Sequence, residues 1–301
     1  MSWQSMHIFY YDNQDVFLSE CIDKILYENG VLDFFFIRYW ENGPHIRLRL
    51  KDIGSIGFNK IMESIYNYID INPSKMIVDE EEYKIRAKKL GEKENLKNID
   101  DYMISNNQIK KYDYIPELKK YHGEFGIKIA EKEFIYSSKL VLKLLRSKPS
   151  QAQKYFYASV FAIILSDSLY ETKEEKLVFF NRYTQYWKAF AMIPEHVLGK
   201  ITKNAEKYPV NQPTLINMEK FYCQNSLYKL HKCIFEELNI LTNNDLSVLE
   251  IFCFNFVHLF NNRIGLSPVE EITVAHICKK ILLELRGENK NGYVQGRKFK
   301  L

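Results

Sequence analysis

An alternating run of cationic and apolar residues is the feature that most constrains this chain. In HIRLRLK, residues 45–51, His45, Arg47 and Arg49 fall at every second position, with isoleucine or leucine between them. Because successive side chains of a strand point to opposite faces, the run predicts a strand with one apolar and one cationic face. A buried, unpaired guanidinium is too costly, so the cationic face must lie at the surface or line a polar cavity.

The rest of the N-terminal half has the pattern of a mixed α/β unit. The strand at 45–51 follows the sequence ENGP, whose Asn-Gly pair is typical of a hairpin turn. Further strands are predicted at 5–11, 33–40 and 109–118, and helices at 13–30 and 58–71. The order β-α-β-β-α-β is that of a ferredoxin-like unit. The polar segment 72–108 interrupts it and is expected to be an insertion or a small subdomain.

The second half carries helical periodicity and few strand signals. Helices are predicted at 127–147, 151–170, 173–192, 214–240, 246–262 and 269–286. We therefore expect an α+β protein in which a small ferredoxin-like antiparallel sheet packs on a larger helical body. We interpret 1–301 as one catalytic domain, with an α/β part at 1–125, a helical part at 126–286 and a loose tail at 287–301.

Composition excludes several classes of function. The net charge of +4 is too mild for a nucleic-acid-binding protein. Five widely spaced cysteines without a C-x-x-C motif favour reduced thiols in the cytoplasm over a zinc site or disulfides. The sequence shows no signal peptide, no apolar run of transmembrane length and no nucleotide-binding or metal-binding motif. We therefore expect no metal, no cofactor, and no nucleic-acid or membrane partner.

The arginines of the predicted hairpin form the first candidate site. Arginine forks suit carboxylates, amide oxygens or a developing oxyanion. Arg38, on the preceding strand, joins the cationic face or the opposite one depending on register. From composition alone, a solvent-facing sheet with arginines for solubility is the simpler interpretation.

Two further stretches could carry chemistry. Glu117 follows Pro116 in a turn that leads into a helix, and it could pair with an arginine of the strand. His258 lies in a strongly apolar helix with asparagines at 255, 261 and 262 around it. A lone histidine in such a helix is usually a core residue, but polar companions favour a cavity-lining position. There it could shuttle protons.

Three ordered stretches resemble a known family. FFFIRYWENGPHIRLRLK, YIPELKKYHG followed by AEKEFIYSS, and VHLFNNRIG occur in the order of the C-terminal domain of lantibiotic dehydratases, also called the thiopeptide-type bacteriocin biosynthesis domain. The resemblance covers nearly the whole chain. It implies one of two activities: removal of glutamate from glutamylated Ser or Thr, or pyridine synthesis by a formal [4+2] aza-cycloaddition of two dehydroalanines, with loss of water and of the leader peptide.

The family pattern carries over to this sequence residue by residue. Arg47 and Arg49 match its arginine pair, Glu117 its turn glutamate and His258 its helix histidine, whereas Lys120 stands where the turn usually has arginine. The resemblance implies a catalytic set of Arg47, Arg49, Glu117, Lys120 and His258. It also implies a substrate-binding set of Arg38, His45, Asn255, Asn262 and Arg263.

The sequence leaves the reaction open between these activities. Lysine cannot reproduce a bidentate clamp, so Lys120, together with a length that leaves no room for a glutamylation domain, favours a stand-alone pyridine synthase. Glutamate elimination is the alternative, supported by His258, Arg47 and Arg49, and a non-catalytic peptide-binding scaffold is a third. Each implies a precursor peptide as partner, beside other enzymes of the pathway. Segment 72–108 is a candidate for docking the leader.

Overall fold

The computed structural model describes residues 2–93, 102–211, 217, 221 and 227–284. It divides into two compact units, which are described separately. Unit 1 comprises Met1–Glu117, Phe134–Pro149 and Asn262–Gly265, and unit 2 comprises Leu118–Glu133, Ser150–Asn261 and Leu266–Leu301. The predicted tail at 287–301 lies outside the described residues.

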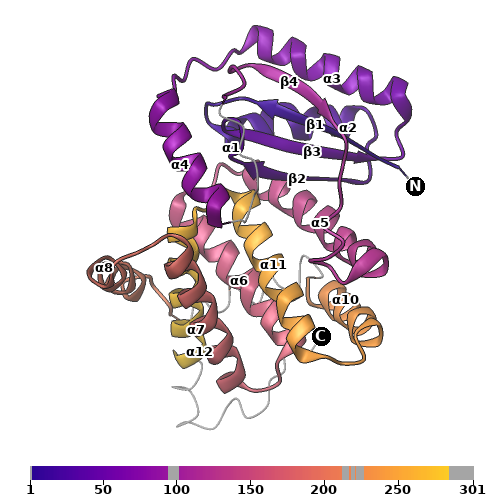
Figure 1. Ribbon diagram of the computed structural model, residues 1–301. Coiled ribbons are helices and arrows are strands. Elements are labelled where there is room, and N and C mark those ends of the chain that lie inside the picture. Colours follow the sequence, from indigo (N-terminus) through magenta and orange to yellow (C-terminus); the bar gives the residue numbers. More distant parts are fainter. Residues whose placement is uncertain (1, 94–101, 212–216, 218–220, 222–226, 285–301) are drawn as a thin grey trace. The chain divides into compact units, whose positions relative to one another are not determined.

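Unit 1 is built around a four-stranded antiparallel sheet (Figure 1). Its strands are β1 (Trp3–Phe9), β2 (Phe34–Tyr39), β3 (His45–Lys51) and β4 (Gln108–Tyr112), in the order β2-β3-β1-β4. Strand β3 pairs with β1 on one side and with β2 on the other, and β4 pairs with β1. This is the ferredoxin-like arrangement predicted from the order of elements. The α+β fold class is likewise confirmed.

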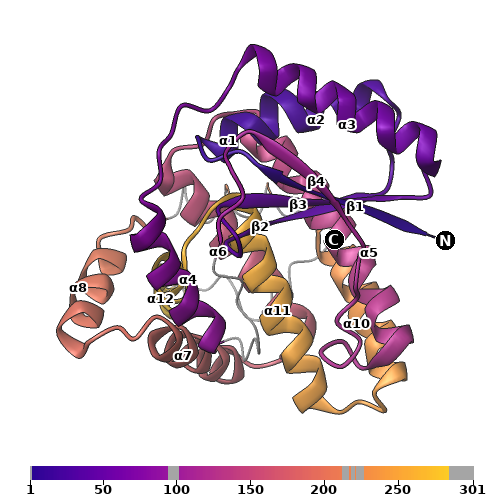
Figure 2. The ribbon, with the colours of Figure 1, turned by 45° about the horizontal axis from the view of Figure 1, so that its top comes forward.

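One face of the sheet is apolar, as the alternation in β3 predicts. The even-numbered side chains Met6, Ile8, Phe36, Ile46, Leu48 and Leu50 are each 0% exposed. Helices α2 (Asp23–Glu28) and α3 (Gly54–Ile71) lie along one face of the sheet in both views (Figures 1 and 2). Helix α3 buries Phe58, Ile61, Ile65 and Ile69, which recur at helical spacing. Short α1 (Gln14–Phe17) and a π-helical turn, η1 (Leu18–Ile22), precede α2.

The turn between β2 and β3 depends on the predicted Asn-Gly pair. Asn42 and Gly43 both have positive φ, at 60° and 115°. A Cβ atom at Gly43 would collide with the hydroxyl of Tyr11. Glycine is therefore required both for the backbone conformation and for this close approach.

The described part of the insertion at 72–108 contains structure that the sequence did not predict. Helix α4 (Glu80–Lys93) buries only Ala87 and Gly91, so its sequence shows no apolar stripe. After α4 the chain returns to the sheet, where Ile104 packs in a small core with Phe9 and Tyr11. Part of the insertion is thus integral to unit 1.

Unit 2 is helical. Its helices are α6 (Gln151–Leu169), α7 (Lys173–Phe190), α8 (Glu195–Glu206), α10 (Leu227–Leu241) and α12 (Pro268–Glu284). Helices α5 (Gly123–Leu145) and α11 (Leu246–Ile264) contribute residues to both units. Every side chain of α6 from Ala158 to Ser166 is buried, which makes α6 a central helix of this unit.

The structure differs from the sequence predictions in two places. The predicted strand at 109–118 ends at Tyr112, and the residues before the turn at Leu118 have no regular structure. Helix α8 was not predicted, since only Ile201 and Ala205 along it are buried. The helix predicted at 214–240 is described from Leu227 as α10, and most of its first half lies outside the described residues.

Candidate functional site

The second face of the sheet carries the predicted cations. We call the set His7, His45, Arg47 and Arg49 the cationic face. His7 lies opposite Arg47 in the β1–β3 pairing, so all four side chains point to the same side. Arg38, opposite Ile46, points to the other side.

Arg47 is held rigidly by its neighbours. His45 Nδ1 donates to the carbonyl oxygen of Gly43 at 2.8 Å, which leaves Nε2 to accept from Arg47 Nε at 3.2 Å. Arg47 Nη2 also pairs with Glu41 Oε2 at 2.7 Å, and its guanidinium lies 3.5 Å from the ring centre of Tyr39. Arg47 is therefore neutralised and stacked within the fold.

Arg49 has a different environment. Its guanidinium carbon lies 5.1 Å from the ring centre of Phe35 and 5.2 Å from that of Tyr114. Among the described residues its buried Nε has no hydrogen-bond partner. Burial, and secondarily the charge of Arg47, lowers the pKa of Arg49 to about 10, while Glu117 has a small opposing effect. The guanidinium as a whole is half-buried, so the part that solvent reaches is suited to bind an anionic or carbonyl oxygen of a ligand.

The two histidines of the cationic face form a stack. The His7 ring lies 4.8 Å from that of His45 and 4.1 Å from that of Tyr112, nearly parallel to both. Burial, followed by neighbouring His45, Arg47 and Arg49, lowers the pKa of His7 to about 2. Burial also lowers the pKa of His45 to about 3, against a hydrogen bond to Gly43 that raises it. Both imidazoles are therefore neutral near pH 7. The sequence analysis did not identify His7, although it alternates with apolar residues in SMHIF.

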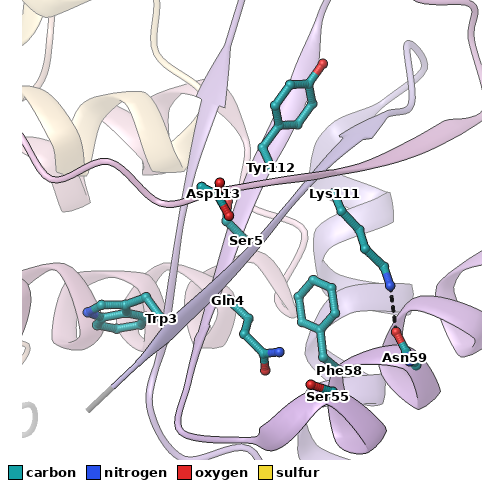
Figure 3. Close-up of a pocket in the computed structure, with 9 residues that line it drawn as sticks. All are labelled: Trp3, Gln4, Ser5, Ser55, Phe58, Asn59, Lys111, Tyr112 and Asp113. Carbon is teal, nitrogen blue, oxygen red and sulfur yellow. Dashed lines mark hydrogen bonds between the residues drawn. The ribbon is translucent and has the colours of Figure 1, made fainter.

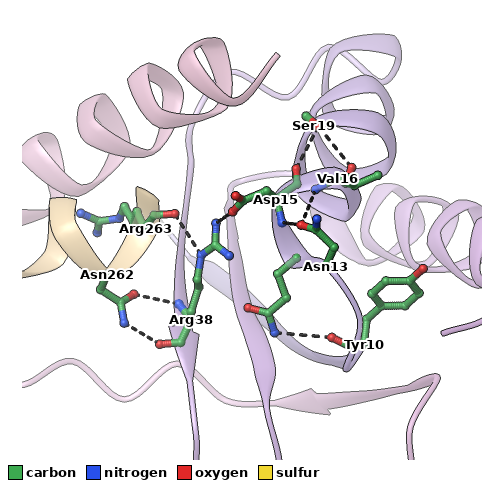
Figure 4. Close-up of polar contacts among 9 residues, drawn as sticks. Tyr10, Asn13, Asp15, Val16, Ser19, Arg38, Asn262 and Arg263 are labelled. Carbon is green, nitrogen blue, oxygen red and sulfur yellow. Dashed lines mark hydrogen bonds and ion pairs between the residues drawn. The ribbon is translucent and has the colours of Figure 1, made fainter. Parts of the chain in front are cut away.

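Three predicted substrate-binding residues take part in a structural network at the edge of β2. Figure 4 shows Asn262 reaching the backbone of Arg38 with both ends of its amide. Its Oδ1 accepts from the Arg38 N–H at 2.9 Å and its Nδ2 donates to the Arg38 carbonyl at 2.8 Å. The Arg38 side chain pairs with Asp15 at 2.6 Å and donates from Nε to the Arg263 carbonyl at 3.0 Å. The amide of Asn262 thus satisfies the backbone N–H and carbonyl of Arg38 on the edge strand β2, as pairing with a further strand would.

Arg263 continues this network. It is 0% exposed, and its Nε donates to the Phe36 carbonyl at 2.8 Å while its Nη1 donates to Ser137 Oγ at 2.7 Å. Ser138 Oγ in turn accepts from the Phe36 N–H at 3.2 Å. The structure thus gives Arg38, Asn262 and Arg263 roles in holding β2, and their contact with substrate stays a prediction.

His258 lies in unit 2 within a buried polar network. Its Nδ1 is 2.9 Å from Glu271 Oε1, and its ring lies 4.6 Å from that of Trp187. Glu271, on the first turn of α12, is 0% exposed, and its second oxygen accepts from Tyr183 and Asn261. The sequence analysis missed Glu271 because no local spacing links it to a histidine on the preceding helix.

The remaining predicted residues have simpler surroundings. Asn255, 8% exposed, donates from Nδ2 to the carbonyl of Ile251 in its own helix at 2.7 Å. Lys120 is exposed, with its Nζ 5.5 Å from the ring centre of Tyr121, and Glu117 is also exposed. Their catalytic or binding roles stay predictions.

A polar pocket of about 450 Å³ opens in unit 1 at one end of the sheet (Figure 3). It contains the pair Lys111 Nζ and Asn59 Oδ1, 2.7 Å apart, and none of the predicted site residues. Within the described part of the chain, no cluster of three or more His, Cys, Asp or Glu side chains could bind a metal ion. Across the same residues, no helix is long and apolar enough to cross a membrane.

Comparison with known families shows to which family the chain belongs. The model of the family described as "Lantibiotic biosynthesis dehydratase C-term" matches residues 3–282. The chain belongs to this family. The resemblance inferred from the three ordered stretches is thereby confirmed, and the family's description connects the chain with lantibiotic biosynthesis.

Among individual proteins, this member of the lantibiotic dehydratase C-terminal family is similar to the epidermin biosynthesis protein EpiB of Staphylococcus epidermidis. The two are 24% identical over 298 residues, covering 93% of this chain and 26% of EpiB. The chain thus spans about a quarter of the length of that curated relative.

The solved structures that share its fold include a pyridine synthase, a lantibiotic dehydratase and TsrL. The pyridine synthase TbtD from thiomuracin biosynthesis has a TM-score of 0.70 at 14% identity, with 95% of this chain and 99% of TbtD covered. The tRNA-dependent lantibiotic dehydratase MibB from Microbispora sp. 107891 has a TM-score of 0.58 at 13% identity, with 97% of this chain and 29% of MibB covered. TsrL has a TM-score of 0.57 at 13% identity, with 94% of each chain covered.

Proposed function

We propose that this protein is a tailoring enzyme that acts on a ribosomally made precursor peptide, and that it eliminates glutamate from glutamylated Ser or Thr. The observation that carries the proposal is the contact between His258 Nδ1 and Glu271. A carboxylate only accepts hydrogen bonds, so it keeps the imidazole proton on Nδ1 and leaves Nε2 as the basic nitrogen. A general base in this state is what removal of an α-proton requires.

In the elimination step, His258 acts as the base. His258 Nε2 takes the α-proton of the modified residue, the Cα–Cβ double bond forms, and the bond from Cβ to the ester oxygen breaks. Glutamate departs as a carboxylate. The His258 side chain is 28% exposed, so solvent can remove the proton it has gained.

The cationic face of unit 1 supports the same proposal through charge. The substrate carries one free carboxylate on its glutamyl group and develops negative charge on the departing ester oxygen. The Arg49 guanidinium is half-buried, and an arginine fork is suited to bind a carboxylate of this kind. Arg47 is already paired with Glu41, so Arg49 is the better candidate of the two.

Pyridine synthesis, which the sequence favoured, is the second candidate. The likeness to TbtD extends over 99% of that chain, and TbtD is a pyridine synthase. Lys120 was one argument for it from the sequence, since lysine cannot reproduce a bidentate clamp. Lys120 is exposed, and its role stays a prediction.

One pair of assays tests both reactions. The purified protein is incubated with a leader-bearing peptide that carries a glutamylated serine, and separately with one that contains two dehydroalanines. Loss of one glutamic acid per site in the mass spectrum is the expected result. Release of the leader as an amide from the second peptide would instead establish pyridine synthesis, and no reaction with either would favour a scaffold.

His258→Asn tests the base within the first assay. We expect elimination to fall about 10²- to 10⁴-fold, as for loss of a general base. His196→Asn, on the exposed surface of α8, is the matched control and should keep full activity. Unchanged elimination in His258→Asn would remove His258 from the mechanism.

A further inference from the structure

Glu271 lies at the centre of a hydrogen-bond network that determines the state of His258. Its Oε2 accepts from the hydroxyl of Tyr183 and, at 3.3 Å, from Asn261 Nδ2, while its Oε1 faces His258 Nδ1 at 2.9 Å. Glu271, Asn261 and Tyr183 are 0%, 0% and 1% exposed. All four residues belong to unit 2.

The two groups that donate to Glu271 Oε2 fix the direction of the hydrogen bonds in the network. Burial and the adjacent Glu271 carboxylate raise the pKa of Tyr183 well above its ordinary value, so the phenol keeps its proton and donates it. Asn261 Nδ2 can only donate. Glu271 also lies in the first turn of α12, where the helix dipole favours negative charge.

We propose that Glu271 is a positioning residue that, with Tyr183 and Asn261, holds His258 as the tautomer protonated on Nδ1. The proposal rests on the proposed function, in which Nε2 takes the α-proton. Glu271 does not touch substrate. It orients the ring, leaves Nε2 unprotonated before the reaction, and offers a carboxylate to the imidazolium once the proton has transferred.

Glu271→Gln is a sharp test because the network dictates how the new amide lies. Tyr183 and Asn261 both donate at the position of Oε2, so the amide oxygen of the glutamine must take that place. Its NH₂ group then faces His258 Nδ1, which must become an acceptor. The imidazole proton of His258 then moves to Nε2, so Nε2 can no longer act as the base, although glutamine has nearly the same shape as glutamate.

The tautomer is read directly by ¹⁵N NMR of protein labelled at histidine, with His258→Asn used to assign the signals. We expect protonated Nδ1 in the wild-type protein and protonated Nε2 in Glu271→Gln. For elimination of glutamate from a glutamylated peptide we expect kcat to fall about 10³-fold or more, with little change in KM, as for a base held in the wrong tautomer.

Two matched variants separate positioning from folding. Glu270→Gln makes the same change at the neighbouring residue. The Glu270 carboxylate accepts hydrogen bonds from the N–H and the hydroxyl of Ser267 and does not contact His258, so this variant should keep both the tautomer and the activity. Tyr183→Phe removes one donor and leaves the Glu271 carboxylate, so we expect the tautomer to stay and kcat to fall less than about 10-fold. A Tyr183→Phe variant that is as inactive as Glu271→Gln while His258 keeps its proton on Nδ1 would overturn the proposal in favour of a structural role.

The outcomes distinguish this proposal from the function on which it rests. An unchanged tautomer in Glu271→Gln overturns the positioning role whatever happens to turnover. A changed tautomer with unchanged turnover keeps Glu271 as the residue that orients His258 and instead refutes His258 as the base.

Discussion

At the scale of single residues, Arg49 is expected to contribute to function at the expense of stability. Its guanidinium is half-buried, and its Nε has no hydrogen-bond partner among the described residues, which costs free energy in the folded state. We predict that Arg49→Met keeps or raises the melting temperature while kcat/KM for elimination falls about 10²- to 10³-fold. Differential scanning calorimetry and the glutamylated-peptide assay measure the two effects.

The control for Arg49 is Lys51→Met, two residues along the same face of β3. It removes a cation whose Nζ lies 5.6 Å from the ring centre of Trp3, and it should change neither quantity greatly. A melting temperature that falls by many degrees in Arg49→Met would show instead that Arg49 supports the fold.

His7 is expected to make the protein sensitive to acid. Its folded pKa of about 2 lies below its ordinary value of 6.5, so between these pH values the unfolded chain binds a proton that the folded chain does not. Stability therefore falls as pH decreases below 6.5, by about 1.4 kcal/mol per pH unit for each such histidine. We predict that His7→Phe, which keeps the stacked ring, makes the free energy of unfolding less dependent on pH, by about 1.4 kcal/mol per pH unit. Urea unfolding between pH 5 and 6.5 measures this dependence.

His196→Phe, at an exposed position, should leave this dependence unchanged. An equal dependence on pH in His7→Phe and the wild-type protein would contradict the prediction.

The sequence predicted individual site residues better than their partners. The alternation in HIRLRLK is enough to place His45, Arg47 and Arg49 on one face, because strand periodicity is local. The pairing of His258 with Glu271 joins two helices, and that of Asn262 with Arg38 joins residues 224 apart in the chain. No local spacing encodes such contacts, so functional and structural polar residues looked alike in the sequence.

At the scale of elements, the edge of β2 is expected to depend on one amide. Asn262 makes two hydrogen bonds to the backbone of Arg38, at 2.9 and 2.8 Å. Asn262→Ala would leave one N–H and one carbonyl of the strand without these partners, and we predict a loss of about 2 kcal/mol in the free energy of unfolding. Urea unfolding measures it, with Asn204→Ala on the exposed surface of α8 as control.

The same variant tests the predicted role of Asn262 in substrate binding. A structural role lowers stability and leaves KM for the glutamylated peptide unchanged at a temperature where the variant is folded. A raised KM with normal stability would support the substrate-binding role instead.

Elements rich in apolar residues were predictable, whereas α4 and α8, which bury two residues each, were not. Helix α3 buries four regularly spaced residues and was predicted close to its observed bounds. Helix α4, in EEEYKIRAKKLGEK, buries only Ala87 and Gly91, so its mixed charges read as a solvated surface. For α4, hydrophobic periodicity carries almost no signal, although lysine and glutamate are good helix formers.

At the scale of the whole molecule, the α+β class could be predicted because the apolar period changes along the chain. Period-2 alternation in the N-terminal half gives way to helical spacing after residue 126, and the structure follows this change. The interpretation of residues 1–301 as one catalytic domain, bound to a precursor peptide, stays a prediction.

Binding of a precursor peptide requires a surface that holds its leader. Segment 72–108 was our candidate for leader docking, and its part at 94–101 lies outside the described residues. Deleting the whole segment would also remove Ile104 from its core with Phe9 and Tyr11, so a loss of binding could reflect unfolding. Two side chains of the segment avoid this problem, since Ile77 is 92% exposed and Ile85 57% exposed.

If the leader docks on this segment, an apolar face of the peptide must cover these exposed isoleucines. We predict that Ile77→Ser/Ile85→Ser weakens leader binding about 100-fold by isothermal titration calorimetry, with an unchanged melting temperature, because each buried isoleucine is worth about 1.5 kcal/mol. Ile56→Ser, at an 88% exposed position on α3, is the control and should bind normally. Equal leader affinity in the double variant and the wild-type protein would place leader binding on another surface, because Ile77 and Ile85 are the apolar side chains that this segment offers most openly on α4 and the loop before it.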